Sequence, residues 1–276
     1  MWFNLFGDEF MNINVVGTSK VAFVLCKILL EEDFSIGCVV SRSKQRAEDF
    51  VAKIGQGFPK TYEEDFTLKG VTFFAVPDQS ISEVYHKLKN RLEEASAFHF
   101  SGFLDSEIFK DFDQKGWARG SIHPNLSFAD EENALKYIKT CCFGIEGNRE
   151  GLLVAKQIVE KISNCWVEIP YGSKGAYHLA AVIASNFNVA LAYLSEKLYK
   201  LYNIKGFQEV IPKLMMSSVH NILKKGVQKS LTGPVAREDW LIVEKEREIF
   251  VKTFPEYKKL YDDMIDILIK IKGEVG

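Results

Sequence analysis

Hydrophobic and polar positions follow two different patterns along the chain. In the first part, short apolar runs alternate with longer amphipathic stretches. The apolar runs predict strands at Asn12–Val16, Ser35–Val40, Val71–Val76, Ala97–Phe100, Ala118–His123, Thr140–Glu146 and Cys165–Ile169. The amphipathic stretches predict helices at Ser19–Glu31, Lys44–Lys53, Gln79–Glu94, Asp105–Asp111 and Asn148–Ile162. This alternation predicts right-handed βαβ units on a mostly parallel sheet, and the near-continuous apolar strands indicate helices on both of its faces.

After Pro170-Tyr171-Gly172 the pattern becomes purely helical. Helices are predicted at Lys174–Tyr202, Pro212–Lys225, Glu238–Val251 and Tyr257–Lys272. We therefore predict an α/β domain over residues 1–169 and an all-α domain over residues 170–276. The first of these helices carries more apolar surface than a small bundle can bury, which favours a homodimer formed through the helical domain.

Composition narrows the class of protein. Hydrophobic residues make up 47% of the 276 residues, charged residues 26%, and the net charge is -2. No basic face indicates nucleic-acid binding, and no uninterrupted apolar run of about eighteen residues predicts a membrane span. Residues 1–10 lack the basic start of a signal peptide. The five cysteines have no C-x-x-C spacing, which is typical of reduced thiols in the cytoplasm, and no metal site is predicted.

A glycine ends the first predicted strand and opens the first helix. Gly17-Thr18-Ser19-Lys20-Val21-Ala22 matches the dinucleotide fingerprint G-x-G-x-x-G/A, with Ser19 in place of the second glycine. A pyrophosphate at this turn would meet unpaired N–H groups and the positive end of the helix dipole. The chain is thus predicted to open with a Rossmann domain that binds a dinucleotide through Gly17, Thr18, Ser19 and Lys20.

The end of the second predicted strand distinguishes NADP from NAD. NAD-binding domains usually place an acidic residue there, but this chain has Ser41-Arg42-Ser43. A guanidinium and two hydroxyls suit a 2′-phosphate, because arginine forms paired hydrogen bonds with phosphate oxygens. The alternative is a solvated helix start with a serine as N-cap. We predict NADP as the cofactor.

Further motifs carry a family resemblance. They are Val71-Thr72-Phe73-Phe74-Ala75-Val76-Pro77-Asp78, Phe98-His99-Phe100-Ser101-Gly102, Ser121-Ile122-His123-Pro124-Asn125, the run from Tyr177 to Asn186, and Leu231-Thr232-Gly233-Pro234-Val235-Ala236-Arg237. The first resembles pyrroline-carboxylate reductases and coenzyme-F420-dependent NADP reductases. Together they resemble a bacterial family of uncharacterised Rossmann-like NADP oxidoreductases with a helical domain of unknown function. The resemblance implies an NADP-binding domain and a helical domain like that of 6-phosphogluconate dehydrogenases, and it implies no particular substrate.

Ligands of such folds bind beyond the carboxyl ends of the strands. Ala75, Val76, Pro77, Ser101, Gly102, His123 and Pro124 lie at such ends and are predicted to contact the cofactor. By resemblance, Ala75-Val76-Pro77 lines the nicotinamide-ribose region. His123-Pro124 is similar to the His-Pro motif of prephenate dehydrogenases, and Ser101 to their active-site serine. Asn125-Leu126 departs from that motif, so the prephenate substrate does not follow.

The helical part adds candidate substrate contacts. Lys174, His178 and Asn186 share one face of the long predicted helix, and Arg237 follows the rigid Gly233-Pro234 turn. Arg237 could hold a carboxylate or pair with Glu238 or Asp239. The Lys-x-x-x-Asn spacing of the β-hydroxyacid dehydrogenases is absent.

These residues lead to two functional hypotheses. The first is an NADP(H)-dependent oxidoreductase acting on a small carbonyl or carboxylated compound, with His123 or His178 as acid/base and Ser101 assisting. The second is an NADP-binding sensor or regulatory protein without turnover, favoured by the degenerate turn and the missing Lys-x-x-x-Asn spacing. A partner for coenzyme F420 is a third reading.

Overall fold

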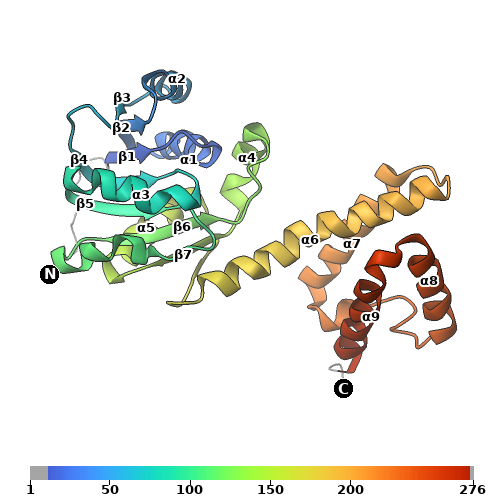
Figure 1. Cartoon of the computed structure of the whole chain (residues 1–276). Helices are drawn as coiled ribbons and strands as arrows, with labels where there is room; N and C mark the ends of the chain where they lie inside the picture. Colours follow the sequence, from blue (N-terminus) through green and yellow to red (C-terminus); the bar gives the residue numbers. More distant parts are fainter. Residues whose placement is uncertain (1–11, 274–276) are drawn as a thin grey trace. The chain divides into compact units, whose positions relative to one another are not determined.

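The computed structural model describes residues 12–273 (Figure 1). The strands are β1 (Asn12–Val16), β2 (Ser35–Ser41), β3 (Phe58–Thr61), β4 (Leu68–Phe74), β5 (Leu92–His99), β6 (Arg119–Pro124), β7 (Phe143–Gly147) and β8 (Trp166–Glu168). The α-helices are α1 (Lys20–Glu31), α2 (Lys44–Ile54), α3 (Asp78–Leu88), α4 (Glu131–Tyr137), α5 (Arg149–Ile162), α6 (Lys174–Leu201), α7 (Phe207–Lys225), α8 (Trp240–Thr253) and α9 (Lys258–Gly273). The longest 3₁₀ helix is η2 (Ser106–Lys115).

The eight strands form one sheet in the order β3-β2-β1-β4-β5-β6-β7-β8. The pairs from β3 to β6 are parallel, β7 is antiparallel to β6, and β8 is parallel to β7. The predicted mostly parallel sheet followed by an all-helical part is therefore confirmed. β2 and β3 lie on one side of β1, and β4 and the later strands lie on its other side. The strand order therefore reverses between β1 and β4, and such a topological switch point is where these folds bind ligands.

Two apolar clusters cover the two faces of the sheet. One contains buried side chains of α1, α2, α4 and α5, among them Phe23, Leu25 and Phe50. The other contains side chains of α3 and η2, among them Tyr85 and Phe109. Both faces are covered because the central strands are apolar on both sides, as the sequence pattern predicts.

The described chain forms two compact units, the first extending to Val182 and the second beginning at Ile183. The first two turns of α6 therefore belong with the sheet, beyond the boundary at residue 169 that the pattern predicts.

The predicted absence of a signal peptide concerns residues 1–10, which lie outside the described part. By length and composition α6 could also cross a membrane, with a mean hydropathy of 1.3 in its most apolar window. A search for uninterrupted apolar runs misses this property.

The cysteines differ from the expectation of reduced thiols. Cys142 and Cys165 precede β7 and β8 and form a disulfide with a Cα–Cα distance of 4.5 Å. Phe143 pairs with Trp166 in the parallel register, so the two preceding residues lie side by side. Cys26, Cys38 and Cys141 are free.

Candidate functional site

The turn between β1 and α1 requires glycine at position 17. Gly17 has φ +106°, and a β-carbon there would lie 2.4 Å from the carbonyl oxygen of Ala75. Its N–H donates to the carbonyl of Val40 at 2.8 Å, which fixes the turn against β2. The predicted tight turn is thus present at the carboxyl end of β1, beside β4. The missing β-carbon lets the backbone of the turn lie directly against Ala75.

Two side chains after Gly17, those of Ser19 and Lys20, already have hydrogen-bond partners within the protein. The Ser19 hydroxyl caps α1 by accepting a hydrogen bond from the Ala22 N–H at 3.4 Å. The Lys20 ammonium donates to the Ala129 carbonyl at 2.5 Å. The Ser19 hydroxyl therefore already accepts from one of the N–H groups at the start of α1 that were predicted to bind phosphate.

At the end of β2, the three predicted residues have different surroundings. Ser41 is buried, and Ser43 caps α2 by accepting from the Arg46 N–H at 3.4 Å, as in the alternative N-cap interpretation. Arg42 is exposed and its side chain has no hydrogen bond or ion pair within residues 12–273. It lines a cavity of about 360 Å³ together with Tyr62, Val76, Pro77, Ser80 and Val84 and with three charged residues, Glu63, Glu83 and Lys87. Lys87 pairs with Glu63 at 2.8 Å. A guanidinium without a protein partner at such a cavity is available for an anion. Sequence reasoning missed Tyr62, which follows the unpredicted strand β3.

A second cavity joins the dinucleotide turn to His123. It has a volume of about 320 Å³ and is lined by Ser19, Lys20, Val21, Phe100, His123, Pro124, Leu126 and Phe128. The carboxyl ends of β1 and β6 therefore contribute to one concave surface. This is the place where a ligand can touch both the turn and an imidazole.

Ser101 lies in a closed polar cluster at the end of β5. Its hydroxyl donates to Asp78 Oδ2 at 2.5 Å and accepts from the N–H groups of Phe103 at 3.2 Å and Leu104 at 2.9 Å. The Ser101 carbonyl accepts from the Lys174 ammonium at 2.6 Å. The hydroxyl is thus occupied in shaping the turn after β5, close to where it was predicted to assist catalysis.

Lys174 is 2% exposed. Burial lowers its pKa to about 8, against the opposing effect of the carboxylates of Glu146, Asp78 and Asp105. Its one hydrogen bond is to Ser101, so in this structure Lys174 supplies positive charge behind the site rather than an exposed contact.

Two imidazoles converge on Gly102. A β-carbon on this glycine would lie 2.5 Å from His178 Nδ1 and 2.8 Å from His123 Nε2. The rings are 6.0 Å apart and nearly perpendicular. His178 Nδ1 is buried without a hydrogen-bond partner in the described chain. Burial, together with the charge of Lys174, lowers the pKa of His123 to about 4, so His123 is neutral at pH 7.

His99, at the end of β5, is fully buried in the core. Its Nε2 lies 3.0 Å from the Asp105 carbonyl, and its Nδ1 accepts from the Ser101 N–H at 3.2 Å. Burial lowers its pKa to about 3, so it stays neutral and fixes the turn that carries Ser101.

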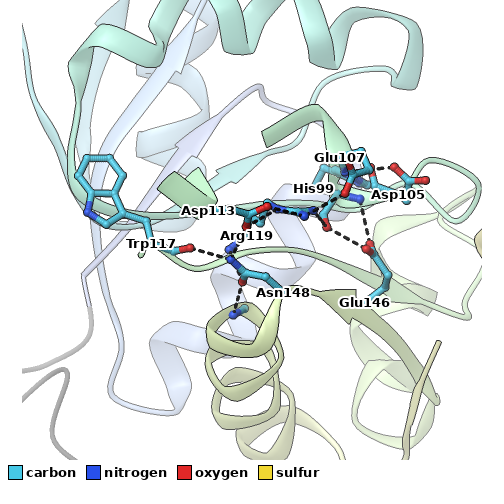
Figure 2. Close-up of polar contacts among 10 residues, drawn as sticks. His99, Asp105, Glu107, Asp113, Trp117, Arg119, Glu146 and Asn148 are labelled. Atoms are coloured by element: carbon cyan, nitrogen blue, oxygen red, sulfur yellow. Dashed lines mark hydrogen bonds and ion pairs between the residues drawn. The ribbon is translucent and has the colours of Figure 1, made fainter. Parts of the chain in front are cut away.

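An ionic network around the buried Arg119 supports this turn (Figure 2). The Arg119 guanidinium pairs with Asp113 at 2.8 Å and Glu107 at 2.9 Å, and it donates to Ser106 Oγ at 2.8 Å. Ser106 in turn donates through its hydroxyl and its N–H to Glu146, at 2.8 and 3.0 Å. The network therefore connects η2 to β6 and β7 and holds the segment between Ser101 and Ser106.

The remaining predicted contacts, Asn186 and Arg237, belong to the second unit. Both are exposed, and neither side chain has a hydrogen bond within residues 12–273. Glu238 pairs with Lys272, so the alternative ion pair of Arg237 with Glu238 is not formed. No group of three or more metal-binding side chains occurs in the described part of the chain.

Comparison with known proteins identifies the family. Protein TM1727 from Thermotoga maritima is 41% identical to this chain, and the match covers 95% of this chain and 98% of that one with a TM-score of 0.80. The profile of a domain of unknown function, DUF2520, matches residues 141–266. The chain contains a DUF2520 domain and belongs to the same family as protein TM1727.

More distant solved structures share the fold of this DUF2520 protein. An imine reductase from Myxococcus stipitatus in complex with NADP⁺ is 11% identical, with a TM-score of 0.68, and the match covers 94% of this chain and 93% of that one. A pyrroline-5-carboxylate reductase from Coxiella burnetii is 15% identical, with a TM-score of 0.58, over 92% of this chain and 98% of that one. No protein with a curated description matches. The DUF2520 protein therefore has the Rossmann-like fold of NAD(P)-dependent reductases, as the sequence resemblance implies.

Proposed function

We propose that this DUF2520 protein is an NADP(H)-dependent oxidoreductase that transfers a hydride to or from a small carbonyl or carboxylated compound. The observation that carries the proposal is the cavity shared by the dinucleotide turn and His123. It brings the turn predicted to hold the pyrophosphate and the imidazole of His123 to one surface, an arrangement that supports hydride transfer to a carbonyl.

The chain's own residues fit the cofactor. Gly17 leaves room for close backbone approach, and the Arg42 side chain forms no hydrogen bond or ion pair within residues 12–273, although the carboxylates of Glu63 and Glu83 line the same cavity. Thr18, Ser19 and Lys20 would face the pyrophosphate, with Arg42 on the 2′-phosphate and Ala75, Val76 and Pro77 along the nicotinamide ribose. When bound, the cofactor supplies the hydride.

The proton chemistry falls to the two histidines. His123 is neutral at pH 7 because burial lowers its pKa to about 4, so it can polarise a carbonyl at the cavity through a hydrogen bond without carrying a charge. His178 places a buried nitrogen without a hydrogen-bond partner among the described residues beside Gly102, next to His123. Lys174 provides a positive potential that favours an anionic substrate, while Ser101 keeps the intervening turn in place.

A substrate panel tests this function. We expect NADPH absorbance to fall with at least one member of a set of 2-oxo acids, β-keto acids and cyclic imines. With that substrate, His123→Gln should lower kcat by about 10²- to 10⁴-fold, the range of general acid–base catalysis. His86→Gln, an exposed histidine on α3, is the control and should keep full activity. Equal activity of the two variants would contradict the role of His123.

A second candidate is a sensor that binds NADPH without turnover. It is favoured by two observations: the Ser101 hydroxyl is fully engaged, and Lys174 is buried. Tight NADPH binding with no oxidation by any member of the panel, nor by the deazaflavin F420, would support the sensor over the reductase.

We also propose that the active form is a homodimer built through the helical unit. α7 and α9 contain no buried residue, and every residue from 183 to 191 of α6 is exposed. Monomeric proteins rarely leave such extended apolar surface uncovered. Ser185, Asn186 and Asn188 interrupt the apolar residues of α6, which suits a protein partner better than lipid, where polar groups are costly.

Light scattering on the purified chain tests the dimer. We expect twice the chain mass of 31.4 kDa. Val189→Asp and Leu223→Asp, at positions 70% and 83% exposed, should lower the mass to that of a monomer because a buried carboxylate opposes association. Phe58→Asp, a similarly exposed apolar position on β3, should leave the dimer intact. A monomeric wild-type protein, or one that stays in solution only with detergent, would contradict the proposal.

A further inference from the structure

Next to His123 lies a pair of polar residues that the function above does not use, Asn125 and Tyr177. The Asn125 backbone N–H and its side-chain Nδ2 both donate to the Cys142 carbonyl, at 3.0 and 3.1 Å. Because a carbonyl oxygen can only accept, this contact fixes which end of the amide is the NH₂ group. The second hydrogen of that NH₂ group donates to Tyr177 Oη.

The sheet leaves a place for the Tyr177 hydroxyl. A β-carbon on Gly144, in β7, would lie 2.3 Å from Oη, so only glycine is compatible with this position of the phenol. On its other side, Oη lies 3.4 Å from His123 Nδ1, and the two rings meet edge to face. Tyr177 is therefore held between Asn125 and His123 by groups from β6, β7 and α6.

The direction of the hydrogen bonds follows from the donors. Oη accepts from Asn125, and His123 Nδ1 is its other polar neighbour among the described residues. If Nδ1 carried a hydrogen, Oη would accept twice and its own hydrogen would lack a protein acceptor in a half-buried position, which is costly. The favoured arrangement is that Tyr177 donates to an unprotonated Nδ1.

We propose that Tyr177 is a positioning residue that holds neutral His123 in the tautomer with its hydrogen on Nε2. Nε2 is the nitrogen that faces Gly102 and converges with His178 Nδ1. The tautomer of a histidine is set by the partner of its other nitrogen. Tyr177 thus makes His123 a hydrogen-bond donor toward the site.

The tautomer of His123 has a consequence for the class of substrate, and this consequence rests on the proposed function. A donor at Nε2 recognises a ligand atom that accepts a hydrogen bond, such as the oxygen of a carbonyl compound. Neutral imidazole polarises carbonyl groups in this way. The site would therefore bind the oxidised substrate, with its acceptor atom on His123 Nε2.

Nuclear magnetic resonance of the full chain with ¹⁵N-labelled histidine tests the tautomer directly. The chain has five histidines, and His123→Gln assigns the signal of interest. At pH 7 we expect His123 to have a protonated Nε2 and a bare Nδ1. Tyr177→Phe should produce a mixture of both tautomers. Tyr171→Phe, a tyrosine that is 77% exposed, should leave the signal unchanged.

A second variant separates the mechanism from general disturbance. In Asn125→Asp, the carboxylate accepts the phenol hydrogen, so Tyr177 can then only accept, and His123 should shift toward the Nδ1-protonated form. Loss of folding would not produce this reversal. A wild-type His123 protonated on Nδ1, or a signal unaffected by Tyr177→Phe, would overturn the proposal. The spectrum requires neither cofactor nor turnover, so a failure of the reductase function remains distinguishable from a failure here.

Discussion

Replacing Gly17 by alanine is expected to weaken NADPH binding strongly and to destabilise the first unit. The new β-carbon would lie 2.4 Å from the Ala75 carbonyl and 2.9 Å from Val76 Cγ1, contacts that require the turn to move. The left-handed φ of +106° adds a strain of about 1–2 kcal/mol. The steric contacts and the backbone strain together should lower the unfolding free energy by about 3 kcal/mol. Titration calorimetry should show NADPH affinity reduced by roughly 100-fold or more, because the displaced backbone no longer faces the pyrophosphate.

Gly55→Ala is the matched control. Gly55 also has a left-handed φ, +91°, but no atom lies within 4 Å of its added β-carbon. This variant should lose about 1 kcal/mol of stability and bind NADPH like the wild type. If both variants bound NADPH equally well, the turn at Gly17 would not be the cofactor site.

Arg119→Ala is expected to lower the unfolding free energy by about 3 kcal/mol. Arg119 is 8% exposed, and its guanidinium forms a two-pronged pair with Asp113 as well as bonds to Glu107 and Ser106 (Figure 2). Its removal leaves these groups without their cation. The two carboxylates are partly exposed, so water offsets some of the loss and keeps it below the upper end observed for buried pairs.

Denaturant unfolding of Arg119→Ala beside Arg149→Ala measures this effect. Arg149 is exposed at the start of α5 and its side chain has no bond within the described residues, so its variant should stay within about 0.5 kcal/mol of the wild type. A loss of equal size in both variants, or none for Arg119→Ala, would show that the network does not hold the turn between Ser101 and Ser106.

The alternation of strands and helices in the first unit could be predicted because its pattern is local and strong. β1, α1, β2 and α5 agree with the predicted ranges to within a residue or two, since each has a continuous apolar run or a helical period bounded by a cap or a turn. The register between distant strands, including the antiparallel pairing of β7, depends on long-range contacts that no local pattern encodes.

The predictions for short elements were wrong where local signals conflict. β3 was missed because it has four residues and contains Pro59, which fits only the edge of a sheet. β5 begins at Leu92, although the predicted helix extended to Glu94. The charged pair Glu93-Glu94 is typical of a helix surface, but here it lies at the exposed start of a strand that carries a bulge beside Lys69.

The part of the candidate site that lies at the carboxyl ends of strands could be predicted from the sequence. His123 meets the dinucleotide turn as the order of the strands requires, and His178 joins it from α6. Tyr177 and Asn125 lie within the family motifs, but no role was predicted for either because neither matches a known pattern of catalytic residues. Gly144, which leaves space for the tyrosine hydroxyl, was the available signal. The disulfide of Cys142 and Cys165 was missed because it depends on the register of β7 and β8.

The most direct test of the account is a comparison of NADPH and NADH binding to the wild type and to Arg42→Ala by titration calorimetry. Arg42 has no protein partner and lines the cavity beyond β2, so a 2′-phosphate would gain a charged hydrogen bond of about 1.5–3 kcal/mol. We expect the wild type to bind NADPH at least about 10-fold more tightly than NADH, and Arg42→Ala to lose this preference while its NADH affinity stays the same. Equal weakening of both cofactors by the substitution, or a wild type that binds neither, would contradict the assignment.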